Sequence, residues 1–445
     1  MKKSTLYITL LVTSALFTSC EKWLDVGNPK DAVETKVVFQ DVSGLQAAIA
    51  GMYNAGNANS IGMLSLNNGM QADDLSATVA GYDPYKNNSL VSNDESVGTT
   101  WSDLYVGVYR STAIIEGVPA APFLETVKNQ AMGEAFFIRA LSYFYLVNLY
   151  GDVPLVLSTH IEETELAPRT AKETVYKQIV SDLEKAVELL PVEYPAKKRD
   201  RANKWAATAL LARVKLYLGD YPEAERLASQ VIDQSSTYIL SENLNTVFGK
   251  NTSVDAIFAF DVSYAGYTTP GLNSVPTPGT VPSIIIHPTL LSLYEEKDAR
   301  KAAWIGTSAG YPFMHKYKVR TGVGDEFDVV LRISEQYFIR AEARVYLNNL
   351  SGAEADVNKI RKRAKVDDIA MASKDQALAS IADERRRELF GEWSHRWFDL
   401  KRTNKVSAVI GALKPEYWQD TDALYPIPRR ERQMNFNLTQ NEGYD

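Results

Sequence analysis

Apolar residues recur at helical spacing along most of the chain. From 132 to 150 the sequence MGEAFFIRALSYFYLVNLY is apolar on nearly every face, which predicts a buried helix. Gly151 and Pro154 follow it and are typical helix stop signals. From 172 to 190, apolar residues three and four positions apart are separated by charged ones, which predicts a helix that packs through a single stripe.

Two later segments share one pattern, in which small and large apolar residues precede a short turn and a return helix. The first begins at 203–218 and turns at Gly219, and the second spans 336–361. Small residues at helical spacing let two helices approach closely, and such a pair buries its apolar face only by stacking on a neighbour. The pattern predicts tetratricopeptide-like helical pairs. Independent helical hairpins in an ordinary bundle are the alternative.

Two stretches of different composition interrupt these helices. Residues 53–98 are rich in Asn, Gly and Ser, and residues 261–288 are rich in Pro and Gly, so neither stretch is expected to form a continuous helix. Long irregular segments in a compact protein often carry function. The predicted fold class is therefore mainly α, with tetratricopeptide-like helical repeats and long irregular, loop-rich insertions.

The N-terminus has the features of a secretory leader. Lys2 and Lys3 precede an apolar run over 6–17, and the small residues Thr18 and Ser19 then lead to the only cysteine of the chain, Cys20. This arrangement resembles a bacterial lipoprotein signal, which implies that residues 1–19 are a signal peptide and that Cys20 becomes the acylated N-terminus. An ordinary secreted protein with a thiol at this position is the alternative.

The charge and the remaining hydropathy limit the other ways of reaching a membrane. The net charge of −7 argues against nucleic acid as a partner and against a basic membrane-binding patch. No later apolar run is long enough to cross a bilayer. The lipid on Cys20 is therefore the expected anchor, since two or more acyl chains suffice for stable attachment.

Three long motifs lie in a fixed order along the chain. They are FFIRALSYFYLVNLYGDVPLV at 136–156, DERRRELFGEWSHRWFDLKRT at 383–403 and LYPIPRRERQMNFNLTQNEGY at 424–444. Together they resemble the SusD/RagB family of outer-membrane lipoproteins of the Bacteroidetes. The resemblance implies one SusD-like domain over 20–445. Its N-terminal part, about 20–220, contains the first helical repeats, and its C-terminal part covers about 260–445.

The closing motifs also have a direct physical interpretation. Charged residues three and four apart surround an apolar group comprising Leu389, Phe390, Trp393, Trp397, Phe398 and Leu400. We interpret them as scaffold, and the alternative is an Arg cluster that binds an anionic ligand. Pro426 and Pro428 exclude helix and predict an extended tail that crosses the repeats.

Signatures of catalysis are sparse. There is no HExxH pair, nucleophile elbow or P-loop, and the four histidines are far apart in the sequence: His160, His287, His315 and His395. The carboxylate pairs Asp73–Asp74 and Asp367–Asp368 are adjacent, and adjacent residues seldom face one reacting bond. The sequence therefore predicts a protein that is not an enzyme. It also predicts no cofactor or catalytic metal. An acidic loop such as Asp325–Asp328 is a candidate for a structural calcium ion, but it lacks a full ligand spacing.

The resemblance implies that loops of the non-repeat half carry the ligand and that an acidic residue faces it. Sugars offer hydroxyls that pair with carboxylates and flat C–H faces that lie on aromatic rings. Trp101 is expected to be a core residue at a helix start, and the tyrosines have an alternative role in fixing loops to the body. The candidate ligand-binding residues are Asp73, Asp74, Tyr82, Tyr85, Tyr264, Tyr267 and Trp304.

The resemblance also implies a function. It predicts an outward-facing lipoprotein of the cell outer membrane, which binds a nutrient glycan and delivers it to a SusC-like TonB-dependent transporter. Peptide cargo is one alternative, a glycoside hydrolase is another, and a purely structural tetratricopeptide scaffold is a third. The sparse catalytic signatures disfavour the hydrolase, whereas aromatic and acidic loops serve glycan and peptide equally well.

Overall fold

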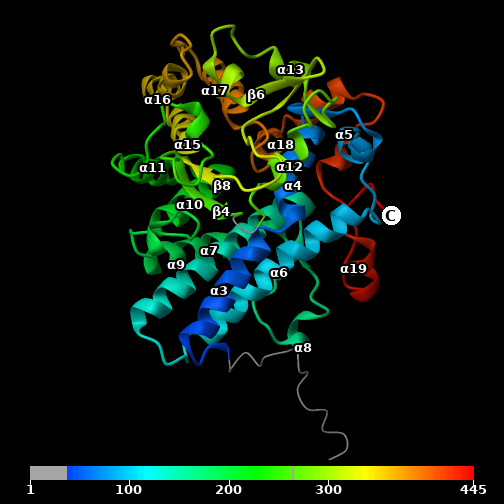
Figure 1. Ribbon diagram of the computed structural model, residues 1–445. Coiled ribbons are helices and arrows are strands. Elements are labelled where there is room, and N and C mark those ends of the chain that lie inside the picture. Colours follow the sequence, from blue (N-terminus) through cyan, green and yellow to red (C-terminus); the bar gives the residue numbers. More distant parts are fainter. Residues whose placement is uncertain (1–37, 263–264) are drawn as a thin grey trace, which may run out of the picture.

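The computed structural model describes residues 38–262 and 265–445 (Figure 1). The predicted signal peptide and Cys20 lie outside the described residues, and so does Tyr264. Within the described part, no helix is long and apolar enough to cross a membrane.

Four long helices lie side by side in the lower half of Figure 1, packed in the order α3, α6, α7, α9. Their bounds are Val42–Gly56, Glu95–Gly117, Glu125–Tyr150 and Lys172–Leu189. The prediction for α7 is confirmed, because nearly every residue from Gly133 to Tyr150 is buried. Arg139 of α7 and Asp182 of α9 form a buried ion pair of 2.8 Å, so the two helices are joined by charge as well as by apolar packing.

The two predicted helical pairs are present. They are α10 (Lys204–Tyr217) with α11 (Tyr221–Ile232), and α15 (Ile333–Tyr346) with α16 (Leu350–Arg363). Gly219, at φ +72°, occupies the tight turn of the first pair, where the left-handed backbone favours glycine. Because α11 packs on α15 and α10 packs on α9, the pairs form a stacked layer, at the left of Figure 1, and are not separate hairpins. Helix α17 (Lys374–Leu389) closes this layer on α15 and α16.

The remaining elements are short. The strands form four antiparallel pairs: β1 (Leu75–Ala77) with β5 (Ile284–Ile286), β2 (Val153–Pro154) with β3 (Arg169–Thr170), β4 (Ala256–Asp261) with β8 (Phe327–Arg332), and β6 (Ile305–Ser308) with β7 (Tyr311–Met314). The short helices are α5 (Asp83–Lys86), α8 (Ile161–Thr164), α12 (Thr269–Ser274), α13 (Pro288–Leu291), α14 (Ala299–Trp304), α18 (His395–Arg402) and α19 (Arg429–Met434). The chain is thus mainly helical, as predicted.

One interrupting segment is more ordered than its composition suggests. Within 53–98, helix α4 (Asn59–Gln71) is almost entirely buried. Its polar residues are held by distant partners: Asn68 donates to Ser394 Oγ at 2.8 Å and accepts from Tyr425 Oη at 2.5 Å. These tertiary hydrogen bonds outweigh the low helix propensity of Asn and Gly, which is a weak local preference.

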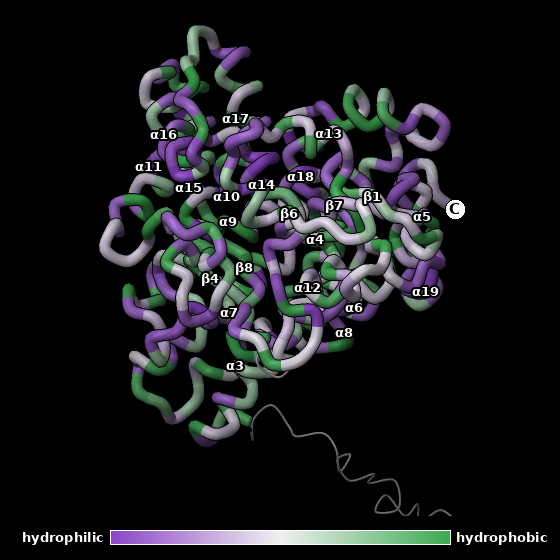
Figure 2. Tube along the Cα trace, turned by 45° about the horizontal axis from the view of Figure 1, so that its top comes forward, coloured by the Kyte–Doolittle hydropathy of each residue, from purple (hydrophilic) through white to green (hydrophobic). Residues whose placement is uncertain are grey.

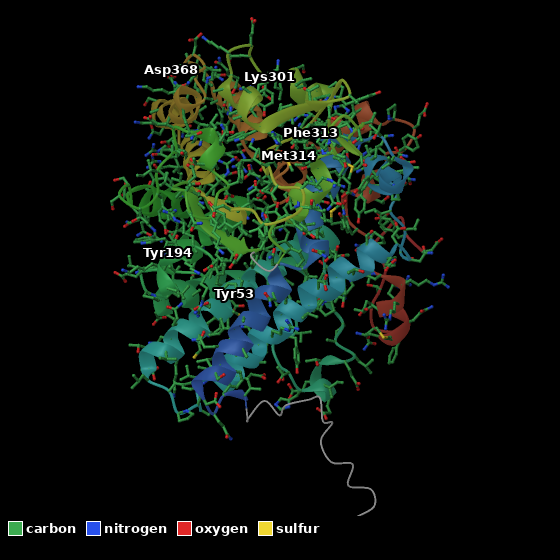
Figure 3. The ribbon with its side chains drawn as sticks, viewed as in Figure 1. Tyr53, Tyr194, Lys301, Phe313, Met314 and Asp368 are labelled. Carbon is green, nitrogen blue, oxygen red and sulfur yellow. The ribbon has the colours of Figure 1, made fainter. Side chains whose placement is uncertain are left out.

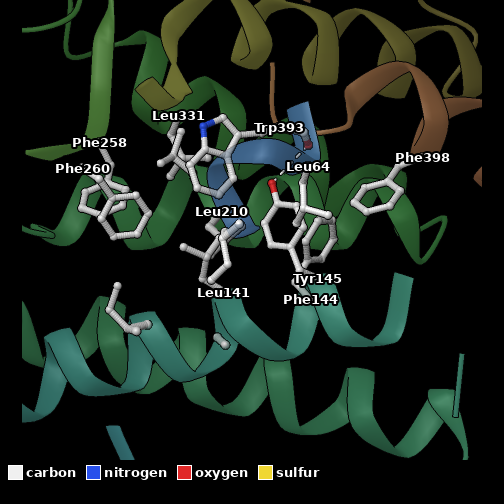
Figure 4. Close-up of a cluster of buried hydrophobic side chains, with 14 of the residues drawn as sticks. Leu64, Leu141, Phe144, Tyr145, Leu210, Phe258, Phe260, Leu331, Trp393 and Phe398 are labelled. Carbon is white, nitrogen blue, oxygen red and sulfur yellow. Dashed lines mark hydrogen bonds between the residues drawn. The ribbon is translucent and has the colours of Figure 1, made fainter. Parts of the chain in front are cut away.

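The core connects the first motif with the closing one (Figure 4). Tyr145 of α7 stacks obliquely against Trp393, with ring centroids 5.5 Å apart, and its hydroxyl donates to the Trp393 carbonyl at 3.2 Å. Phe144 meets Phe398 edge to face at 6.1 Å. Trp101 and Trp397 are also buried, which confirms their assignment to the core.

The charged residues of the closing motif form a buried ion-pair network and not an exposed anion site. Glu388 lies among Arg300, Arg332 and Arg363, at 3.2 Å from Arg300 and 2.6 Å from Arg332. Burial alone would raise the pKa of Glu388, but the three guanidiniums hold it well below its ordinary value. Arg385 pairs with Asp399 at 2.8 Å. The interpretation as scaffold is confirmed.

The tail follows a different path from the one predicted. It does not cross the helical pairs but lies against α6 and the end of α7, at the right of Figure 1. The Tyr425 amide donates to the Leu149 carbonyl at 2.8 Å, and Asn441 Nδ2 donates to the Tyr150 carbonyl at 2.9 Å. The last carbonyls of α7 have no partner within their helix, and the tail supplies one.

Candidate functional site

The loop-rich part of the molecule forms one continuous face. Figure 2 shows β6, β7, β1 and α5 next to one another across it. These elements are in contact with one another, because β1 pairs with β5 and β5 contacts β7. Figure 3 places Phe313 and Met314 of β7 within this region, and both side chains are buried beneath the face.

A hollow of about 340 Å³ opens on this face beside α5, and we call it the α5 hollow. Its size is that of a small-molecule pocket. It is lined by Met70, Leu75, Ser76, Lys86, Asn87, His287, Leu413, Lys414, Pro415, Glu416 and Tyr417. The walls therefore come from α4, β1, α5, the start of α13 and the loop after α18, which lie far apart in the sequence.

Two titratable side chains in the hollow are held by hydrogen bonds. His287 Nδ1 lies 2.8 Å from Thr289 Oγ1, and burial lowers the pKa of His287 below its ordinary value, so the ring is neutral at pH 7. Lys414 Nζ donates to the carbonyls of Met70 and Gln71 and to Asn88 Oδ1, at 2.7 to 3.0 Å. Burial lowers the pKa of Lys414 to about 7.

The rim and the lining offer the contacts that sugars use. Tyr417 is 50 % exposed and follows Pro415, so its ring is available at the mouth. Asn87, Ser76 and His287 supply amide, hydroxyl and imidazole groups beside the apolar Met70 and Leu75. A flat ring next to mixed donors and acceptors suits a sugar face and its hydroxyls. Among the described residues that line the hollow, Glu416 is the one carboxylate.

Asp73 and Asp74 lie behind the α5 hollow and not in it. Asp73 accepts two hydrogen bonds from Arg396, at 2.7 and 3.0 Å, and Asp74 accepts one from Arg386 at 2.8 Å. Burial would raise the pKa of Asp73, but the two guanidiniums outweigh it and lower the pKa. The carboxylates are 4 % and 1 % exposed, so the structure corrects the expectation that they face a ligand. Thr289, which is hydrogen-bonded to His287, also donates to the Asp73 carbonyl at 3.0 Å. The segment that contains the two aspartates therefore supports the hollow from behind.

The predicted aromatic residues do not converge. Tyr85 is buried and donates to Ser96 Oγ at 2.8 Å, whereas Tyr82 is half-buried at the start of α5. Tyr267 is half-buried before α12. Trp304 is fully buried, and its indole N–H donates to the Leu244 carbonyl at 3.1 Å, so it has no face for a ligand and is a core residue. Trp304 follows a Pro-rich segment, but its ring packs against Phe248 and beneath the cationic groups of Lys316 and Arg332.

Sequence reasoning missed Tyr417 and Asn87. Both satisfy the criterion applied elsewhere, an aromatic or amide side chain on an irregular, polar segment: Tyr417 lies in KPEYWQD and Asn87 in YKNNS. Only the fold shows that these two segments meet across one hollow. In the described chain no cluster of three or more His, Cys, Asp or Glu side chains has the geometry of a metal site, and Asp368, at the outer edge in Figure 3, lies in an exposed turn.

Comparison with known families gives two matches. A family model described as starch-binding and associating with the outer membrane matches residues 22–216, and a second, described as the SusD family, matches residues 289–444. The two together cover most of the chain and include all three motifs.

Related proteins are similar over most of their length. SusD-like protein P25 of Formosa agariphila is 26 % identical over an alignment of 514 positions, gaps included, which covers 96 % of this chain and 97 % of that protein. The starch-binding protein SusD of Bacteroides thetaiotaomicron is 25 % identical over 430 residues, covering 72 % and 73 %.

Solved structures share the fold. A SusD superfamily protein of Bacteroides vulgatus has a TM-score of 0.81 at 17 % identity, over 91 % of this chain and 100 % of that one. A laminarin-binding SusD-like protein has a TM-score of 0.77 at 24 % identity, over 91 % and 100 %. At these identities the likeness establishes the fold.

Proposed function

The chain belongs to the SusD/RagB family, whose members bind glycans without catalysis, and on this premise we propose that it binds a nutrient oligosaccharide at the α5 hollow. The observation that carries the proposal is the combination at one mouth of an exposed ring, Tyr417, with the amide of Asn87 and the neutral imidazole of His287. Catalysis by two flanking carboxylates finds no support there, since Asp73 and Asp74 are engaged by arginines.

The partner and the location complete the proposal. A lipoprotein anchored through Cys20 would hold the oligosaccharide at the outer surface and pass it to a SusC-like TonB-dependent transporter. Transfer requires reversible binding, and dissociation constants from micromolar to millimolar correspond to about −8 to −4 kcal/mol. The description of the matching family as associating with the outer membrane supports this location.

A glycan and peptide binding array, followed by calorimetric titration, tests the proposal. Tyr417→Ala and Asn87→Ala should each weaken binding of the oligosaccharide that the array selects. Loss of one stacked ring is worth on the order of 1 kcal/mol, which is about fivefold in affinity. Tyr109→Ala is the matched control, because Tyr109 is 54 % exposed but lies on α6 and lines a different hollow. Its affinity should equal that of the wild type.

Three results would contradict the proposal. If the array selects peptides and no glycan, the family member is a peptide binder. If wild-type protein shortens the oligosaccharide during titration, it is a glycoside hydrolase. Equal affinity for wild type, Tyr417→Ala and Asn87→Ala would place the glycan site elsewhere on the surface.

A further inference from the structure

A second hollow lies on another part of the surface, between the end of α7, the start of α9, the end of α10, α18 and the tail. Its volume is about 900 Å³, within the range of ligand pockets. We call it the basic hollow. The charged side chains that line it are Asp152, Arg169, Lys172, Glu173, Lys177, Lys215, Lys401 and Arg402.

Six of these eight side chains are cationic, in a chain whose net charge is −7. Two of the six are already neutralised: Lys215 pairs with Asp220 at 3.2 Å, and Arg402 pairs with Glu342 and Asp399 at 2.6 and 2.8 Å. The other four make no ion pair with a carboxylate of residues 38–262 or 265–445. They are Arg169, Lys172, Lys177 and Lys401.

Lys401 and Arg169 are fixed in place by neutral partners. Lys401 Nζ donates to the Asn148 carbonyl, and Arg169 Nε donates to the Asp152 carbonyl at 2.7 Å. Burial, with the nearby charge of Lys172, lowers the pKa of Lys401 to about 7, which reflects the cost of a cation with poor solvation and no counter-charge. An anion in the hollow would offset that cost.

The rest of the lining fits a sugar ring better than an extended chain. Half-buried Tyr176 and Tyr217 contribute aromatic surface, and Asn148 and Asn441 contribute amides. The strands beside the hollow, β2 and β3, are each two residues long, which is too short to offer the strand edge that extended peptides use.

We propose that the basic hollow binds the anionic unit of an acidic oligosaccharide, through a uronate carboxylate or a sulfate ester. The ligand class rests on the proposed glycan-binding function. The site is separate from the α5 hollow, because the two share no lining residue. Lys172 and Lys177, both exposed on α9, would meet the anion at the rim, and Lys401 would meet it at the floor.

Calorimetric titration with four probes of similar length tests this proposal at about 50 and 200 mM salt. The probes are tetragalacturonate, a sulfated carrageenan tetrasaccharide, neutral cellotetraose and tetraglutamate. The test variant is the double substitution Lys172→Gln, Lys177→Gln. The matched control is Lys359→Gln, Lys362→Gln, which removes two exposed charges from one face of α16. Neither variant touches a buried side chain, so both should fold.

We expect at least one anionic saccharide to bind, and to bind more weakly at the higher salt. The test variant should lose about fivefold in affinity, whereas the control variant should have the affinity of the wild type. Preference between the galacturonate and the carrageenan probe then tells carboxylate from sulfate. The proposal is overturned if neither acidic saccharide binds, if the test variant binds like wild type, or if only tetraglutamate binds. The two proposals remain distinguishable: anionic binding that the test variant weakens supports the basic hollow whether or not the α5 hollow binds the oligosaccharide that the array selects.

Discussion

On the helical side of the molecule, helices near in sequence pack through apolar stripes, as α10 does with α11 and α15 with α16. On the loop side, which comprises residues 57–94, 265–318 and 403–428, segments hundreds of residues apart are joined by side-chain hydrogen bonds. Thr289 donates to the Asp73 carbonyl, and Lys414 donates to the carbonyls of Met70 and Gln71. Both sides bury apolar residues in one core, but the contacts that shape the α5 hollow are polar and join distant segments.

The largest effect is expected where the two sides meet. Glu388 of α17 pairs with Arg300 and Arg332, which come from the loop side and from β8, and with Arg363 of α16. Glu388→Ala leaves three buried guanidiniums short of a counter-charge, and breaking a buried ion pair costs about 3–5 kcal/mol. Chemical denaturation should show at least this loss in the free energy of unfolding.

The control for this prediction is Glu223→Ala. Glu223 pairs with Arg226 on the surface of α11 at 2.7 Å, with both side chains about half exposed. Such pairs contribute about 0–1 kcal/mol. If the two variants lose similar stability, the buried network does not join the two sides.

The next effect separates a core aromatic from a rim aromatic. Trp304→Ala removes a fully buried indole and should cost about 3–5 kcal/mol, whereas Tyr417→Ala removes a half-exposed ring and should leave the melting temperature nearly unchanged. Thermal melting of both variants measures the difference. A stable Trp304→Ala protein would show that the ring is not buried in solution and would restore it as a ligand candidate.

A smaller effect tests the polar contacts of the loop side. Asp74→Asn keeps an acceptor for Arg386 but removes the charge, so we expect a loss of about 1–3 kcal/mol. Chemical denaturation measures this loss in the free energy of unfolding. Glycan binding should also weaken, because the segment that contains Asp73 and Asp74 supports His287. Asp367→Asn is the control, because the exposed Asp367 carboxylate forms an ion pair with the exposed Lys297. The melting temperature of this variant should equal that of the wild type. No loss for Asp74→Asn would mean that the loop side is held by other contacts.

The two sides also differ in how far the sequence predicts them. Helices α7 and α9 and both helical pairs can be predicted from the spacing of their apolar residues, because the apolar residues that indicate each helix also form its packing surface. Helix α4 could not be predicted, since Asn68 is stabilised by Tyr425 and Ser394, more than 300 residues away. The α5 hollow has the same origin: Asn87 and Tyr417 each resemble an ordinary loop residue until the fold brings them together.

The smallest effect concerns pH and again distinguishes the loop side. Lys414 has a folded pKa of about 7, against about 10.4 in an unfolded chain, so the unfolded state binds more protons between these values. The contribution of Lys414 to stability is therefore present above pH 10 and is lost as the pH falls towards 7.

Lys414→Met removes this titration, and the lost hydrogen bonds add a cost that does not vary with pH. Without solvent screening, the two pKa values correspond to a change of about 3.5 kcal/mol between pH 7 and pH 10 in the difference in unfolding free energy between wild type and variant. Because Lys414 is only half-buried, solvent screening reduces this change to about 1–2 kcal/mol, in favour of wild type at the higher pH. Denaturation at both pH values measures it, with Lys359→Met, at an exposed lysine of α16, as the control whose difference should stay constant. A constant difference for Lys414→Met as well would mean that its ammonium is hydrated in the folded protein, and that the loop side is more open to water than its hydrogen bonds suggest.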